Sequence, residues 1–185
     1  NEKLLLPRVG TKESSEKEAD AIDEQNKVII AGFGRVGNTI GRFLQANHVT
    51  ATYLDIDPNN VDLLRKLGLK VFYGDACRHD LLHAAGAEQA ELLVVAIDEP
   101  EKTLELVHTA KKHFPHLKLI VRSKSWFDSY DLIDEGVDHI YRETLDSALR
   151  IGSDVLSHLG YRRHQAYRAA KTFRRHDERF LHELA

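Results

Sequence analysis

The stretch KVIIAGFGRVG, residues 27–37, constrains the fold of this chain more than any other. An apolar, β-branched run leads directly into a Gly-x-Gly-x-x-Gly pattern formed by Gly32, Gly34 and Gly37. In such a turn the first glycine permits the sharp bend, the second lets the backbone approach a pyrophosphate, and the third allows close packing of helix on strand. The stretch therefore predicts a buried strand, a phosphate-binding turn and a helix whose first N–H groups face the ligand.

Apolar runs and helical patterns alternate along the chain after this turn. The further runs that favour strands are TATYLDID, LKVFYGDA, AELLVVAID, LKLIVRS and VDHIY, and a helical pattern separates each from the next. Strict alternation with short links predicts a parallel sheet covered by helices on both faces. We therefore predict an α/β fold, a doubly wound parallel six-stranded Rossmann-like sheet followed by two C-terminal helices.

Composition divides the chain into three segments. Residues 1–26 are acidic and polar and predict a linker, residues 27–142 a nucleotide-binding domain, and residues 143–185 two C-terminal helices. The last helix is rich in arginine, but the net charge of −3 gives no general attraction to nucleic acid. The single cysteine, Cys77, fits a reducing cytosol. The chain contains no methionine, so we expect it to be a fragment of a longer protein.

Polar residues at the ends of the predicted strands are candidates for nucleotide contacts. Asp55 is placed to bond ribose hydroxyls. Asp57 is either a second ribose contact or the cap of the helix beginning at Pro58. Asp75 is a ligand contact, a helix N-cap or both, and Arg35 either contacts a phosphate or lies in solvent. The predicted nucleotide site comprises Gly32, Gly34, Arg35, Val36, Gly37, Asp55, Ile56, Asp57, Asp75, Ala76 and Ile97.

The sequence offers little for catalysis. Two helices after residue 142 are too little for the substrate domain that a dehydrogenase of this fold needs, and no nucleophile–base pair is evident. His108, His113 and His116 lack the regular spacing of metal ligands. We therefore expect no catalytic residue, no metal site and no enzyme activity.

Several stretches together resemble the RCK or KTN domain, a cytosolic regulatory domain of potassium transport. They are VIIAGFGRVG, LDIDP, VFYGDA, LLHAAGAEQAELLVVAIDEPE, HFPHLKLIVRS, YRETLDSALRIG and the terminal FRRHDERFLHEL. The likeness covers residues 27–180 and points to Kef-type bacterial glutathione-gated potassium efflux systems, which are potassium/proton antiporters. It implies a membrane antiporter domain upstream in the full-length chain and a location at the cytoplasmic face of the bacterial inner membrane.

The same resemblance implies a gating mechanism. The domain forms a homodimer, holds AMP or another adenine nucleotide such as NAD(H) in the Rossmann cleft, and binds glutathione near the dimer interface. Glutathione keeps the antiporter closed, glutathione S-conjugates open it, and a flavodoxin-like ancillary subunit is often required. Carried over by position, the glutathione site falls on Arg42, Arg142 and Asp177. Arginine forks suit the two carboxylates of glutathione.

Two positions depart from the family pattern. Asp177 stands where familiar members have asparagine, and Leu67 stands where they have the phenylalanine of RKFG. An aspartate can accept a hydrogen bond from the ligand ammonium but repels a carboxylate. Two other functions remain open at this point: a free-standing NAD(H)-sensing subunit of a potassium uptake system, and an NAD-dependent oxidoreductase.

Overall fold

The computed structural model describes residues 26–184, so all but the last residue of the predicted linker lies outside the described residues. The elements are β1 Val28–Ala31, α1 Arg35–Ala46, β2 Ala51–Asp55, α2 Pro58–Lys66, β3 Val71–Tyr73, α3 His79–Ala84, β4 Leu92–Val95, α4 Pro100–His113, β5 Lys118–Ser123, α5 Trp126–Asp134, β6 His139–Arg142, α6 Leu145–His158 and α7 Arg163–Leu184.

The six strands form one parallel sheet in the order β3-β2-β1-β4-β5-β6, which confirms the predicted fold class. All four residues of β1 are buried, as expected for a central strand covered on both faces. The strand order reverses between β1 and β4. In doubly wound sheets the crevice for ligands lies at this switch point, beside the carboxyl ends of the strands.

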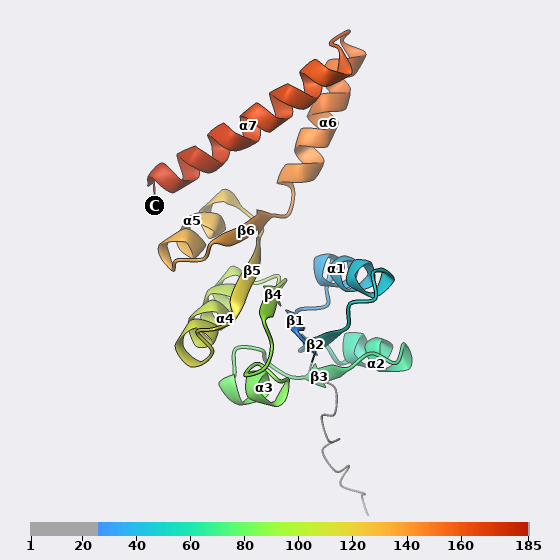
Figure 1. Ribbon diagram of the computed structural model, residues 1–185, viewed down its shortest axis with the longest axis vertical. Helices are drawn as coiled ribbons and strands as arrows, with labels where there is room; N and C mark the ends of the chain where they lie inside the picture. Colours follow the sequence, from blue (N-terminus) through green and yellow to red (C-terminus); the bar gives the residue numbers. More distant parts are fainter. Residues whose placement is uncertain (1–25, 185) are drawn as a thin grey trace, which may run out of the picture.

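Two apolar clusters form the core. The larger contains Ile29, Leu54 and Leu93 together with buried residues of α3, α4 and α5. The smaller contains Ile30 and Tyr53, with partly buried side chains of α1 packed against it. Figure 1 shows α1 and α2 gathered around the first half of the sheet and α4 and α5 beside the second.

Helix ends follow local sequence signals. Pro58 and Pro100 occupy the first turns of α2 and α4, where a missing N–H costs nothing. Ser125 and Asp128 form a capping box at the start of α5. None of the helices within residues 26–184 is long and apolar enough to cross a membrane.

Helices α6 and α7 form an antiparallel arm that projects beyond β6, and α7 returns toward α5 (Figure 1). Asp146 of α6 pairs with Arg174 of α7. The ion pair between Arg142 and Asp177 links the end of β6 to α7. The arm is therefore tied to the sheet close to its carboxyl edge.

Candidate functional site

A cavity of about 460 Å³ opens at the carboxyl ends of the first four strands. It therefore lies in the crevice where this fold binds nucleotides. Its lining includes eight of the eleven predicted residues, namely Gly32, Gly34, Asp55, Ile56, Asp57, Asp75, Ala76 and Ile97. The other lining residues are Phe33, Leu54, Asn60, Gly74, Ala96, Asp98, Glu99 and Lys102.

A side chain at each of the three glycines of the turn would have a different effect. Gly32 has φ +90°, and a Cβ there would lie 2.8 Å from the carbonyl oxygen of Ala96. A Cβ on Gly37 would lie 1.9 Å from the carbonyl oxygen of Gly32. At Gly34 a Cβ would meet no described atom within 4 Å. The fold thus requires Gly32 and Gly37, whereas Gly34 keeps open the space in front of α1.

The N-terminus of α1 faces this open space without a side-chain cap from the described residues. The first N–H groups of a helix have no partner inside the helix, and the helix dipole places positive charge there. An anion such as a phosphate can accept hydrogen bonds from these N–H groups and is attracted by the positive charge.

Asp55 is buried and holds the loops of the cleft together. The N–H of Phe33 donates to its Oδ2 at 2.6 Å, and the N–H of Asp57 donates to its Oδ1 at 2.7 Å. Asn60 adds a third, longer hydrogen bond from Nδ2, at 3.3 Å. Because a carboxylate has about four acceptor positions, Asp55 still has capacity for a ribose hydroxyl. That contact stays a prediction.

Asp57 caps α2, since its Oδ1 accepts from the N–H of Asn59 at 2.8 Å. The cap alternative is therefore confirmed, although the residue also lines the cavity. For Asp75 the cap alternative is wrong, because α3 begins only at His79 and its N-cap is Arg78. Three residues, Ala76, Cys77 and Arg78, separate Asp75 from the first residue of the helix.

Asp75 instead anchors the β3–α3 loop beside the cleft. Its Oδ1 accepts from the N–H of Cys77 at 2.9 Å, and its Oδ2 from Nζ of Lys102 at 3.1 Å. The Cys77 N–H and the Lys102 ammonium hold the pKa of Asp75 below its usual value. Burial, with Asp75 nearby, raises the pKa of the Cys77 thiol to about 12. The thiol donates to the carbonyl oxygen of Lys102, so Cys77 is a structural thiol.

Three predicted residues do not line the cavity. Val36 and Gly37 lie in the first turn of α1, and Arg35 points its guanidinium to solvent, where Nη2 lies 3.4 Å from Oε1 of Glu143. Sequence reasoning in turn missed Asp98, Glu99 and Lys102. Asp98 directly follows β4, so the rule that found Asp55 and Asp75 at strand ends could have found it.

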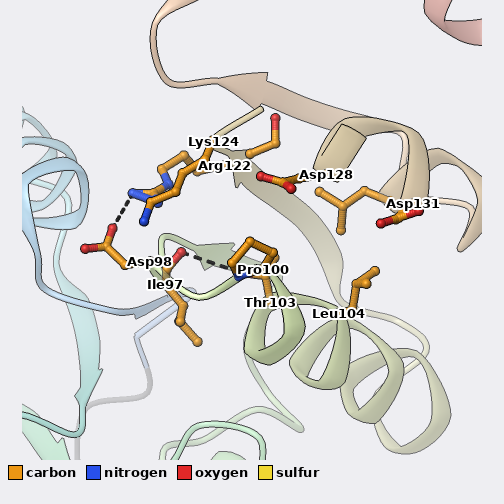
Figure 2. A pocket seen from close by; sticks show the side chains of 11 residues that line it. Ile97, Asp98, Pro100, Thr103, Leu104, Arg122, Lys124, Asp128 and Asp131 are labelled. Atoms are coloured by element: carbon orange, nitrogen blue, oxygen red, sulfur yellow. Dashed lines mark hydrogen bonds and ion pairs between the residues drawn. The ribbon is translucent and has the colours of Figure 1, made fainter. Parts of the chain in front are cut away.

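A chain of ion pairs continues from the cleft across the second half of the sheet edge. Arg122, near the end of β5, is buried and places Nη1 2.7 Å from Oδ1 of Asp98 (Figure 2). Its Nη1 also lies 3.4 Å from Oε2 of Glu143, whose other oxygen contacts Arg35. Nε of Arg122 is buried and has no hydrogen-bond partner among the described residues.

The predicted glutathione residues are only partly brought together. Arg142 and Asp177 form an ion pair in which both side chains are largely buried. Arg142 also lines a second cavity, of about 530 Å³, between α5–β6 and α7. That cavity is rich in basic residues: His139, Arg142, Arg174, Arg175, Arg179 and His182. Arg42 is exposed on α1 and does not line it, so within one chain it is separate from the other two.

Leu67 is exposed at the C-terminal end of α2.

Among residues 26–184, no group of three or more His, Cys, Asp or Glu side chains could hold a metal ion.

Comparison with known proteins gives two family matches. Residues 28–143 match the TrkA-N domain, and residues 147–185 match the potassium efflux system KefB C-terminal domain. A solved structure of the Shewanella denitrificans Kef C-terminal domain in AMP-bound form is 47% identical, with a TM-score of 0.79. The alignment covers 86% of this chain and 98% of that one.

Two more distant structures show the fold alone. The TrkA-N domain of the Escherichia coli inner membrane protein ybaL is 23% identical, with a TM-score of 0.65, over 70% of this chain and 96% of that one. The GsuK channel bound to NAD is 17% identical, with a TM-score of 0.63, over 70% of this chain and 24% of that one.

Proposed function

The chain belongs to the TrkA-N domain family, as an RCK-type C-terminal domain of a Kef-type potassium efflux system, and we propose that it gates a potassium/proton antiporter by sensing two ligands. One is an adenine nucleotide in the cleft. The other is glutathione, which closes the antiporter, in competition with glutathione S-conjugates, which open it. The observation that carries the proposal is the arm. Helix α6 leaves the sheet after β6, and α7 returns so that Asp177 pairs with Arg142, at the same sheet edge that carries the nucleotide cleft.

The cleft suits a nucleotide in charge and shape. The uncapped start of α1 offers N–H groups for a phosphate, and the acidic side chains at the ends of β2 and β3 are acceptors for ribose and adenine donors. The AMP in the Shewanella relative supports the same ligand class here. The match of residues 147–185 favours an efflux system over a subunit of an uptake system.

The glutathione site needs a free guanidinium, but in this structure Asp177 already occupies that of Arg142. A ligand carboxylate must therefore compete with Asp177, while the ligand ammonium can bind to it. We propose that glutathione binds where Arg142 meets Asp177 and that a homodimer supplies Arg42 from the other protomer. The exposed position of Arg42 on α1 is compatible with such a contact.

Calorimetric titration with glutathione and with an S-alkyl glutathione tests this site. A charge-assisted hydrogen bond contributes about 1.5–3 kcal/mol, so Arg142→Ala should weaken binding roughly ten- to a hundred-fold and leave AMP binding unchanged. Asp177→Asn should strengthen glutathione binding, because it frees Arg142 from a competing carboxylate. Arg168→Ala, an exposed position on α7 outside the basic cavity, is the matched control. Equal affinity in all four proteins would show that the site is misplaced.

We further propose that the domain senses its ligands without transforming them. The matches to the TrkA-N domain and to the KefB C-terminal domain of a potassium efflux system support this. The resemblance extends the proposal to the cytoplasmic face of the inner membrane, beneath an antiporter domain, with a flavodoxin-like ancillary subunit as partner. Steady oxidation of NADH with any keto acid would contradict the non-enzymatic proposal.

A further inference from the structure

Open space at the carboxyl edge of the sheet falls sharply beyond Asp98. At the ends of β1–β4 the cleft has a volume of about 460 Å³. Beyond Asp98, between the ends of β4 and β5 and the helices α4 and α5, the hollow has a volume of only about 10 Å³, room for about one water molecule. Ile97 and Asp98 line both spaces and so form the wall between them.

Ion pairs join the strand ends beyond the cleft. Arg122 reaches from the end of β5 to Asp98, which follows β4, and to Glu143, which follows β6. Figure 2 shows the guanidinium of Arg122 and the carboxylate of Asp98 joined across the gap between the strand ends. The side chain of Arg122 is only 6% exposed, whereas that of Asp98 is 54% exposed.

In a doubly wound fold a dinucleotide crosses the switch point, and its second nucleotide lies over the second half of the sheet. We infer that the Asp98–Arg122 ion pair restricts the cleft to mononucleotides by closing it between the ends of β4 and β5. A dinucleotide can enter only if Asp98 leaves Arg122, and this removes a partner from a buried guanidinium whose Nε has no hydrogen-bond partner among the described residues. The inference rests on the proposed nucleotide site and adds the class of nucleotide that it accepts.

Calorimetric titration with AMP and with NAD tests the inference in three proteins. Wild type should bind AMP at least about ten-fold more tightly than NAD. In Asp98→Ala the ratio of AMP affinity to NAD affinity should fall about ten-fold or more. Most of this change should come from tighter NAD binding, because the side chain that separates the two spaces is removed. Arg122 keeps Glu143 in this variant, so the fold is retained. Asp98→Asn, which keeps the size of the side chain, should shift the preference less.

Glu99→Ala is the matched control, since it removes a neighbouring carboxylate from the same cleft and leaves the Asp98–Arg122 pair intact. It should change both affinities by the same factor. Equal affinity of wild type for AMP and NAD would overturn the inference, as would an unchanged preference in Asp98→Ala, while AMP binding itself would still support the nucleotide site. If wild type binds neither nucleotide, the proposed function fails together with the inference.

Discussion

Gly34 is the residue at which nucleotide binding can be separated from folding. Its backbone has φ −65°, and an added Cβ would meet no described atom, so Gly34→Ala should fold with a melting temperature lowered by a few degrees at most. The new methyl group stands where a phosphate approaches the start of α1. We expect AMP to stop raising the melting temperature in this variant, as measured by differential scanning fluorimetry.

Two other glycines serve as controls for that experiment. Gly152→Ala, in α6, also meets no described atom and should keep the full response to AMP. Gly37→Ala should instead destabilise the fold itself, because its Cβ would collide with the carbonyl oxygen of Gly32. An undiminished AMP response in Gly34→Ala would place the phosphate elsewhere.

Cys77 should be unreactive as long as the protein is folded. Burial raises the pKa of its thiol to about 12, so very little of the reactive thiolate is present near neutral pH. A raised thiol pKa contributes stability that is present below pH 9 and is lost as the pH rises toward 12. Labelling with a thiol reagent at pH 8 should therefore be slow until urea unfolds the chain; fast labelling of the native protein would contradict this burial.

The sequence predicted some residues of the site and missed others. Asp55, Asp57 and Asp75 were found because parallel strands bring their carboxyl ends to one edge. Their hydrogen bonds to backbone N–H groups depend on loop conformations that the sequence pattern does not contain. Arg122 could not be found, because its partners Asp98 and Glu143 lie about twenty positions away on either side and meet it only once three strands are paired.

At the scale of elements, α7 is held to the body at few points. Leu181 is one of its buried side chains and lines the basic cavity beside β6. Leu181→Ala removes part of this packing, and such a substitution in a core costs about 2–5 kcal/mol. We expect α7 to open locally while the sheet stays closed, because α7 has little other buried surface.

Hydrogen exchange measured peptide by peptide tests this local opening. Amides of α7 should exchange faster in Leu181→Ala, whereas those of β1 and β4 should not change. Phe173→Ala, at an exposed position of the same helix, is the control and should leave the exchange of α7 near that of wild type. Uniformly faster exchange in all elements would show that α7 is part of the global folding unit.

The elements themselves followed closely from the sequence. Alternating apolar and helical patterns are local, so every strand and helix within residues 26–184 was predicted, with ends that differ by a few residues. The short β3 is an example, since only Val71–Tyr73 of the stretch LKVFYGDA pairs with β2. The return of α7 to β6 was not derivable from periodicity, because its contacts, such as the Arg142–Asp177 pair, join residues 35 positions apart.

At the scale of the whole molecule, α6 carries an apolar stripe that is more than half exposed in the described part of the chain. Ile151, Val155 and Leu159 follow one another at four-residue spacing and are all exposed, and no residue within 145–158 is buried. A homodimer with twofold symmetry would cover such a stripe on both copies. We expect wild type to sediment as a dimer and Val155→Glu to sediment as a monomer that still binds AMP.

A wild-type chain that sediments as a monomer at micromolar concentration with AMP present would contradict the dimer, and with it the supply of Arg42 from a second protomer. Asp154→Ala, next to the stripe but polar, is the matched control and should leave the dimer intact.

Native mass spectrometry of the purified chain, titrated with AMP, tests the central claim most directly, because it reports ligand and assembly in the same spectrum. A ligand-sensing domain of this kind should give a dimer that takes up one AMP for each chain, with the cleft at the end of β1–β4 saturating before any further ligand binds. A spectrum of monomers that remain free of nucleotide at millimolar AMP would contradict the account.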